Sequence, residues 1–349
     1  MRTKFFLKLC FVILSAFGLA SCTSQQKDSF RPLSFDRMYA ALAEMNDLLA
    51  NSTFGTEDGT YPVESAAILE TAIDNLQEGL SKGLAGMFIL QYEVDVYCIA
   101  AEKSIAEFKE TLQVTLLPGT PAELRVFGID GKGHIEFGED PAFAGGEAFT
   151  VESWLKYDKG FYEAGIGSFI STFDGRSPNE GWMVNFMGDN LRTTIAVGPS
   201  SGVLEHGNAY PTNFGEWNHI VAVWDNSLPE NQLKMYVNGE VFFVKTNDTG
   251  NNYAPNTRNP RMWAFQEAQD RGRCMTGYIK KFRFWNTAKS EAEVKALMKT
   301  EVSGNEAGLV CAWDFTEVAE NSESIPDKTG KFNAKIVGSH KWYKADSNQ

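Results

Sequence analysis

The strongest constraint on the fold is a change in the spacing of apolar residues along the chain. From Phe35 to about Gln113 they recur every three or four positions, the spacing of one face of an α-helix. Beyond Pro121 the spacing becomes two, in many short runs separated by Gly, Asn, Asp and Pro, which is typical of a β-sandwich or barrel. The chain is therefore expected to form two domains, and its 349 residues are long enough for two cores.

The first domain is predicted to be an antiparallel three-helix bundle over residues 35–113. Pro62 suits the start of the second helix, where its missing N–H is not needed, and Gly83 and Gly86 are expected to end it. The segment DGTYPVESAAILETAIDNLQEGL, residues 58–80, resembles the helical repeat modules of bacterial surface and carbohydrate-active proteins. The expected core stripes are Met38, Leu42, Met45 and Leu49, then Leu69, Ile73, Leu76 and Leu80, then Val94, Tyr97, Cys98, Ala101, Ile105, Phe108 and Leu112.

Residues 114–122 are predicted to be a linker, because VTLLPGTP contains two prolines and a glycine. An all-β domain is expected over residues 123–345. Within it, WNHIVAVW is apolar in both alternating sets and is predicted to be a central strand covered on both faces. Asn238-Gly239 predicts a two-residue hairpin turn, and Ser290 with Glu293 predicts a capping box that opens a short helix.

The order of motifs in this second part resembles the LamG-like, concanavalin A-like jelly rolls. The motifs are FGIDGKGHIEFG, AFTVESWLK, EWNHIVAVWD, LKMYVNGE, GYIKKFRFWNTAKSEAEVKAL, AGLVCAWDF and IPDKTGKFNAKIVG. The resemblance implies two antiparallel sheets of about six or seven strands with a concave face, and a hairpin formed by the first motif. Four tryptophans lie within motifs shared with the family and are expected to be core residues: Trp154, Trp217, Trp224 and Trp285.

The N-terminal residues resemble the signal peptide of a bacterial lipoprotein. A basic stretch precedes an apolar core at residues 9–20, too short to span a bilayer comfortably. The sequence Leu-Ala-Ser-Cys that ends at Cys22 is similar to a lipobox. The resemblance implies a signal peptide over residues 1–21, a lipid anchor on Cys22 and a polar tether over residues 22–34. Thr23 stands where some lipoproteins carry the aspartate that retains them at the inner membrane, which favours the outer membrane.

Charge and cysteine content limit the partners. The net charge is −13, and near −16 without the three basic residues of the signal peptide, so nucleic acid is not an expected partner. Three cysteines remain beyond Cys22, an odd number, which does not fit a disulfide framework. Cys98 is interpreted as a buried apolar residue, while Cys274 and Cys311 either form a pair or remain buried thiols.

The same fold contains glycoside hydrolases, which need two closely spaced carboxylates. In that superfamily these lie in a Glu-x-Asp-x-Glu or Glu-x-Asp-x-x-Glu strand. The single Glu-x-Asp of this chain, Glu93-Val94-Asp95, lies in a predicted helix without a further glutamate at either position. No enzymatic activity is therefore expected.

Two polar segments are the candidate ligand-binding sites. The first runs from Asp174 through Arg176 to Trp182, where polar groups would bind sugar hydroxyls and the indole would stack on a ring. Its alternative interpretation is a solvated hairpin loop with a core Trp182. The second is the long segment 247–273, which is either functional or a variable surface loop. Its candidate residues are Tyr253, Arg261, Trp263 and Gln266.

A calcium site is a further expectation from the resemblance. Related jelly rolls hold an ion with aspartates near the chain ends, and Asp130, Asp314 and Asp327 lie at matching places. The alternative is three turn aspartates that cap their own backbone.

Together these observations predict an envelope-anchored, non-catalytic lipoprotein. Its jelly roll is expected to bind a ligand, most readily a glycan. The alternative is a protein-binding or adhesion module with a surface protein as partner, and a glycoside hydrolase with an atypical site is the third hypothesis.

Overall fold

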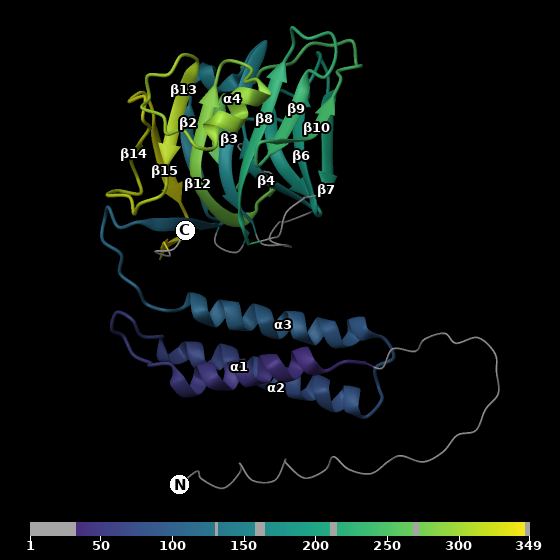
Figure 1. Ribbon diagram of the computed structural model, residues 1–349, viewed down its shortest axis with the longest axis vertical. Helices are drawn as coiled ribbons and strands as arrows, with labels where there is room; N and C mark the ends of the chain where they lie inside the picture. Colours follow the sequence, from purple (N-terminus) through teal and green to yellow (C-terminus); the bar gives the residue numbers. More distant parts are fainter. Residues whose placement is uncertain (1–32, 130–131, 158–164, 210–214, 268–271, 346–349) are drawn as a thin grey trace, which may run out of the picture. The chain divides into compact units, whose positions relative to one another are not determined.

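The computed structural model describes residues 33–129, 132–157, 165–209, 215–267 and 272–345, so that Cys22 and Asp130 lie outside the described residues. The chain divides between Thr115 and Leu116 into two compact units, and each is described by itself (Figure 1). In the described part of the chain, no helix is long and apolar enough to cross a membrane.

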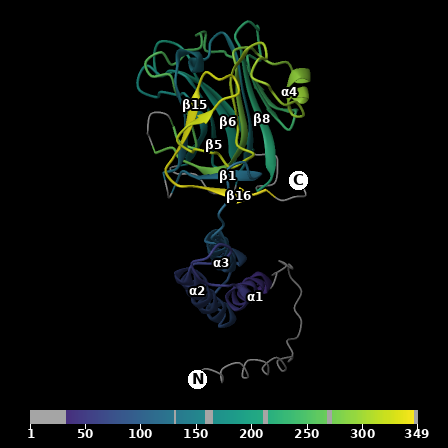
Figure 2. The same cartoon turned by 90° about the vertical axis from the view of Figure 1, so that its left-hand side faces the viewer.

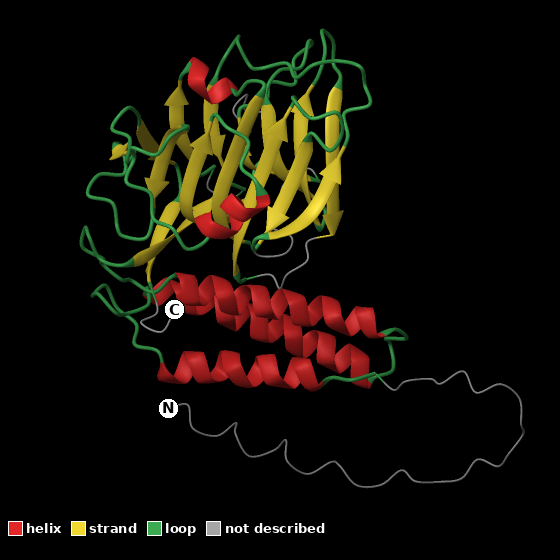
Figure 3. Ribbon diagram, turned by 45° about the horizontal axis from the view of Figure 1, so that its top comes forward, coloured by secondary structure: helices red, strands yellow, loops and turns green. Residues whose placement is uncertain are grey.

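The first unit is a three-helix bundle, as the apolar spacing predicts. Its helices are α1 (Asp36–Asn51), α2 (Ala66–Leu84) and α3 (Gln91–Glu110), and a 3-10 turn at Val63–Ser65 precedes α2 (Figure 3). The helix α2 runs through Gly83, which is buried against Phe35, so the expected break there is wrong. Only Gly86, with a φ of +73°, lies beyond the helix end. The fully buried residues of this core include Met38, Met45, Leu69, Leu76, Val94, Cys98 and Phe108.

The second unit is an all-β sandwich of two antiparallel sheets (Figure 2). Each sheet has eight strands among the described residues, rather than six or seven. The order in the first sheet is β10 (Glu240–Lys245), β9 (Leu233–Val237), β8 (Trp217–Asp225), β3 (Ala148–Lys156), β12 (Thr276–Trp285), β1 (Ala122–Phe127) and β16 (His340–Lys344). The eighth strand, β13 (Leu309–Asp314), also pairs with β12.

The second sheet carries the longer run of neighbouring strands. Its order is β14 (Ile325–Pro326), β15 (Asn333–Val337), β2 (His134–Glu139), β11 (Arg261–Ala264), β4 (Ile166–Ser171), β5 (Trp182–Met187), β6 (Asn190–Ala196) and β7 (Val203–Ala209). A 3-10 turn at Pro141–Ala144 and the helix α4 (Glu291–Leu297) complete the unit.

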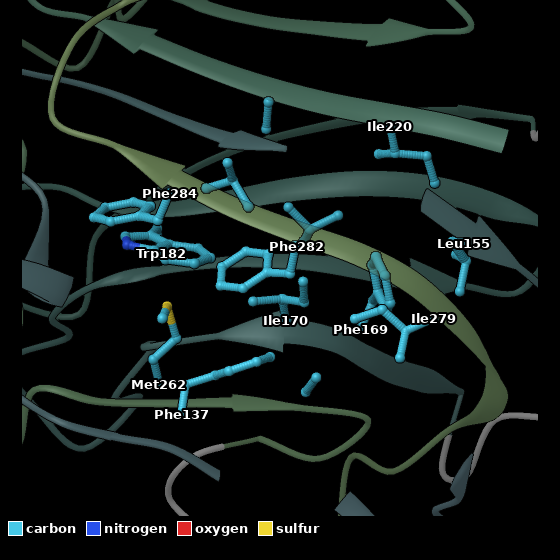
Figure 4. Close-up of a cluster of buried hydrophobic side chains, with 14 of the residues drawn as sticks. Phe137, Leu155, Phe169, Ile170, Trp182, Ile220, Met262, Ile279, Phe282 and Phe284 are labelled. Carbon is cyan, nitrogen blue, oxygen red and sulfur yellow. The ribbon is translucent and has the colours of Figure 1, made fainter. Parts of the chain in front are cut away.

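Inward-facing side chains of both sheets form one aromatic-rich core (Figure 4). Phe282 stacks on Trp313 with ring centroids 6.0 Å apart, and Phe284 stacks on Trp182 at 5.4 Å. Burial of such large apolar side chains is the main stabilising term of a sandwich.

Three local predictions are confirmed. Asn238 and Gly239 both have positive φ and join β9 to β10. Ser290 and Glu293 form the reciprocal capping box of α4. The strand β8 is central, since its inner residues join the core while Val221 and Val223 on its outer face pack under Val294 of α4.

Other expectations need correction. The first family motif is not a hairpin, because β1 and β2 belong to different sheets and the chain crosses between them. The second half of the predicted linker is part of the sandwich, since the Gly119 N–H donates to Val318 O and β1 begins at Ala122. Cys274 and Cys311 are separate, buried free thiols.

Candidate functional site

The outer face of the second sheet contains a hollow of about 190 Å³, open to solvent. Side chains that alternate with core residues along β4 to β7 line its base, and the loop after β4 closes one end. Apolar and polar groups are mixed in its wall. The lining residues are Ile166, Phe173, Gly175, Asn179, Met183, Asn185, Arg192, Thr194, Val203, Glu205 and Arg273.

Strand register brings the polar wall together. Asn185 of β5 is the direct partner of Arg192 on β6, and Thr194 of β6 is the partner of Glu205 on β7. The Thr194 hydroxyl lies 3.4 Å from the Asn185 side-chain oxygen, and Arg192 forms an ion pair with Glu205. Paired charges, amide and hydroxyl groups on one face suit a neutral polyol, which both donates and accepts hydrogen bonds.

One buried hydroxyl beside the hollow has no partner among the described residues. Ser168 of β4 is the direct partner of Asn185, so both side chains share this face, yet the Ser168 Oγ makes no hydrogen bond. An unsatisfied buried polar atom costs free energy unless a ligand or water satisfies it. Ser168 is completely buried and does not line the hollow, so its hydroxyl lies beneath the polar wall.

Arg273 reaches the hollow from the segment that follows β11. Its guanidinium lies 3.5 Å from the carboxylate of Glu267, which is completely buried. The turn that positions Glu267 places the bulky, buried Phe265 at a φ of +66°, a conformation that L-residues adopt rarely. The Phe265 N–H donates to Phe169 O and its carbonyl accepts from the Met275 N–H, which holds it there.

Trp263 lies on the same outer face as the hollow, on β11. It is the direct partner of Ser171 on β4 and of Glu136 on β2. The indole is half-buried, and its ring centroid lies 4.7 Å from that of His134. Trp263 is therefore a surface aromatic residue two strands away from β5, as the sequence-based hypothesis requires.

The first candidate loop satisfies its own polar groups. The buried Asp174 carboxylate accepts hydrogen bonds from the Arg176 backbone N–H and guanidinium at 2.6–3.1 Å. Arg258 donates to the carbonyls of Arg176 and Pro178 and pairs with Glu180 at 3.1 Å. Burial alone would raise the pKa of Asp174, but these hydrogen bonds and the nearby arginine charges outweigh it and hold its pKa below the usual range.

Asp174 is therefore a structural residue of the loop, whereas Gly175 and Asn179 of that loop line the hollow. Arg176 keeps 57% of its side chain exposed at the rim of the loop.

Trp182 is not available to a ligand in this fold, which corrects the hypothesis of a stacking platform. It is fully buried in the sandwich core, and its indole N–H donates to Phe143 O at 3.1 Å. Its ring stacks on Phe284 (Figure 4). The alternative interpretation, a core tryptophan in a hairpin loop, is the one that the structure supports.

The remaining candidates of the long segment are dispersed. The Tyr253 hydroxyl donates to Ala144 O at 2.5 Å and its ring packs against Phe149, and burial raises the pKa of this tyrosine. Arg261 is exposed and pairs with Glu139 at 3.1 Å. Gln266 is 7% exposed. None of these three residues is among the described residues that line the hollow.

The aspartates proposed for calcium are engaged otherwise. Asp327 is buried, and its two oxygens accept the backbone N–H groups of Thr329 and Phe332. Asp314 accepts the backbone N–H and hydroxyl of Thr316 and lies 3.4 Å from the Lys328 ammonium. No cluster of three metal-ligating side chains exists among the described residues. The contacts of Asp314 and Asp327 match the alternative of turn aspartates that cap their own backbone, while Asp130 lies outside the described residues.

A second polar group lies buried on the outer face of the first sheet. Glu152 is fully buried and accepts hydrogen bonds from Arg283 at 2.8 Å and from the Trp285 indole at 3.0 Å, with His219 at 3.2 Å. Arg283 also donates to Leu297 O and Thr300 O at the end of α4. The hydrogen bonds of Glu152 and Arg283 therefore connect α4 to the sheet.

Comparison with known proteins agrees with the sandwich. Residues 130–295 match the model of the concanavalin A-like lectin/glucanases superfamily. This match lies within the β unit, which the helical region precedes. Residues 34–112 match a domain of unknown function (DUF4972), and none of the curated proteins matches the chain.

Several solved structures are similar to parts of this chain at low identity. A Bacteroides ovatus protein, provisionally described as carbohydrate binding, is 19% identical over 67% of this chain with a TM-score of 0.47. A pentraxin from Limulus polyphemus is 12% identical, covering 65% of this chain and 96% of its own, at 0.42. The carbohydrate-binding module CBM40 of a Ruminococcus gnavus sialidase is 12% identical over 46% of this chain and 92% of its own, at 0.38. The chain spans 62% of the length of the Bacteroides ovatus protein.

The sequence interpretation missed the wall of the hollow. Asn185, Arg192 and Thr194 alternate with core residues in strands that are buried along most of their length, so the sequence gives them no distinctive pattern. Glu205 lies in β7, a strand that the apolar spacing did not predict. The alternation of Arg192 and Thr194 with Leu191 and Ile195 was the available signal.

Proposed function

We propose that the sandwich binds a neutral glycan at the hollow on the outer face of the second sheet. The observation that supports this best is the mixed wall, in which the Arg192–Glu205 pair, Asn185 and Thr194 adjoin apolar side chains. Hydroxyl groups of a sugar would satisfy the polar groups, and its C–H face would cover Met183 and Val203.

The size of the hollow limits what it can hold. Pockets for drug-sized ligands measure roughly 300–1,000 Å³, while this hollow measures about 190 Å³. It therefore accommodates one sugar ring, and neighbouring rings of an oligosaccharide would extend across the sheet toward Trp263.

A non-catalytic role is part of the proposal. The hollow as described contains one carboxylate, Glu205, and Arg192 forms an ion pair with it. Hydrolysis of a glycosidic bond uses two facing carboxylates. Together with the missing Glu-x-Asp-x-Glu strand, this favours binding over cleavage.

The proposal predicts that Arg192→Ala and Trp263→Ala each weaken glycan binding by about tenfold, because the loss of one contact worth about 1.4 kcal/mol is one decade in Kd. A glycan array with residues 23–349 identifies a neutral oligosaccharide, and calorimetry then measures the Kd of each variant. Arg37→Ala is the control, since Arg37 also pairs with a glutamate, Glu102, but lies in the helical bundle; its side chain is 51% exposed, against 12% for Arg192. Absence of any array signal, or equal Kd values in all variants, would contradict the site.

We also propose that the protein is anchored to the cell envelope, in the outer membrane, through lipid on Cys22. The lipobox-like Leu-Ala-Ser-Cys sequence supports this, and residues 22–34 would be the tether. Several acyl chains together hold a protein at a bilayer, at about 0.8 kcal/mol per buried methylene. Cys22→Ala is expected to move the protein from the membrane fraction to the soluble fraction and to abolish labelling by a fatty-acid analogue, while Ser21→Ala retains both. Continued labelling of Cys22→Ala would refute the anchor.

A further inference from the structure

The outer face of the first sheet is divided into two halves of different character. The helix α4 covers one half, where Val294 packs on Val221, Val223 and Tyr236. The other half, where β8, β3, β12, β1 and β16 lie side by side, has aromatic and basic side chains on the same outer face. Most of them are half-buried, and Arg125 is buried. The family resemblance predicted a core position for Trp217, but its side chain is half-buried on this outer face, so that expectation is wrong. The hollow does not involve these side chains.

Strand register aligns five of these residues in a single row. Lys341 is the direct partner of Arg125, which is the partner of Tyr278, which is the partner of Lys156, which is the partner of Trp217. Directly opposed residues of antiparallel strands project from the same face of a sheet. The row crosses five strands, and at about 4.8 Å between strands it is roughly 19 Å long.

Cations and rings are in contact along this cation–aromatic row. The Lys156 ammonium lies 4.1 Å from the Tyr278 ring centroid and 5.2 Å from that of Trp217. Arg125 lies 5.1 Å from the Tyr278 ring. Such contacts hold both the rings and the cations in fixed positions.

A second line of residues widens the row. The Lys280 ammonium lies 5.4 Å from the Trp217 ring, and the Tyr343 ring lies 5.8 Å from Tyr278. Lys341 in turn lies 5.2 Å from the Tyr343 ring. The aromatic surface therefore continues from Trp217 through Tyr278 to Tyr343, with a lysine near each end.

The row gathers basic side chains on an acidic protein. Arg125, Lys156, Lys280 and Lys341 lie along it, whereas the whole chain carries a net charge of −13. Among the described residues, the Glu123 carboxylate accepts a hydrogen bond from the Trp217 indole and pairs with Lys156. A local field opposite to the net charge selects an anionic partner and orients it on this face.

We propose that the cation–aromatic row binds an acidic polysaccharide, a polymer with carboxylate or sulfate groups. Its anionic groups would pair with Lys280 and Lys341, and its sugar rings would stack on Trp217 and Tyr343. A row that crosses five strands suits an extended chain, whereas the hollow suits one ring. The two sites lie on opposite sheets, so this proposal does not depend on the neutral-glycan site.

Dextran sulfate and dextran are the probes, because they share a backbone and differ in charge. We expect residues 23–349 to bind dextran sulfate and not dextran, with affinity that falls as salt screens the charges. Lys280→Glu with Lys341→Glu should weaken the binding at least tenfold. The control is Lys234→Glu with Lys245→Glu, which makes the same charge change on β9 and β10 at the other edge of the same sheet. Polygalacturonate, titrated in parallel, distinguishes carboxylate from sulfate recognition.

Three outcomes would overturn the proposal. Equal weakening in the control variant would mean that the whole surface charge, rather than the row, attracts dextran sulfate. Equal binding of dextran would remove the role of the cations. A dimer in analytical ultracentrifugation that the Lys280→Glu, Lys341→Glu variant abolishes would mean that a second acidic copy of this chain occupies the row. The Lys280→Glu, Lys341→Glu variant should still bind a neutral oligosaccharide on the array. A failure of the acidic-polysaccharide proposal can therefore be distinguished from a failure of the neutral-glycan proposal.

Discussion

Replacing Glu152 by alanine is expected to lower the free energy of unfolding of the sandwich by about 3–5 kcal/mol, because the change leaves a buried charge without its partner. Arg283 is 2% exposed and has the Glu152 carboxylate 2.8 Å away. The Trp285 indole N–H loses its acceptor in the same change. Urea unfolding followed by the circular dichroism of the β unit measures the loss.

Two further variants test the cause. Glu152→Gln keeps the shape and one acceptor oxygen but removes the charge, so it should fall between the native chain and the alanine variant. Glu291→Ala, on the exposed side of α4, removes a carboxylate that pairs with Lys295 in solvent and should change stability by less than about 1 kcal/mol. If Glu152→Ala unfolds with the same midpoint as Glu291→Ala, the buried group does not hold α4 to the sheet.

The architecture was predictable because local pattern and global packing agree in this chain. The change of apolar spacing near Pro121 separates the bundle from the sandwich, and the turn at Asn238-Gly239 fixes a hairpin by backbone conformation alone. Strands of low apolar content were missed because they lack this regular apolar spacing. His340–Lys344 is an edge strand whose described side chains are half-buried or exposed, so it carries no periodic signal.

The hollow was not predictable from the same pattern. Along β5 both alternating sets are buried, from Trp182 to Phe186, so burial alone does not separate core residues from residues of the outer face. Periodicity gives two sets of side chains without saying which one faces the partner sheet. Asn185 belongs to the outer set, and Trp182 belongs to the core.

The loop candidates illustrate a second limit. Asp174 and Arg176 look like a ligand-binding pair in the sequence, yet Arg258, some 80 positions further along the chain, bonds to Arg176 O and Pro178 O. A polar loop whose groups hydrogen-bond within the protein and a polar loop whose groups bind a ligand have the same composition. Only the long-range pairing of the segments distinguishes the two, and the sequence does not contain that pairing as a local pattern.

Trp182→Ala is expected to lower the free energy of unfolding by about 3–5 kcal/mol, the cost of truncating a large aromatic residue in a packed core. Its ring stacks on Phe284 at 5.4 Å and approaches Phe149 at 6.0 Å, and deletion leaves a cavity between the sheets. Trp263→Ala removes the same number of atoms from a half-buried position on the outer face and should cost much less stability.

The pair of tryptophan variants separates a core role from a binding role in one comparison. Below the melting temperature of both variants, Trp182→Ala should bind the array-selected glycan with native affinity, while Trp263→Ala should bind it about tenfold more weakly, one decade for about 1.4 kcal/mol. Urea unfolding gives the free energy of unfolding of each variant, and calorimetric titration gives the Kd of each. A Trp182→Ala protein of native stability would refute its place in the core, and a Trp263→Ala protein that is destabilised but binds normally would refute the role of β11 in recognition.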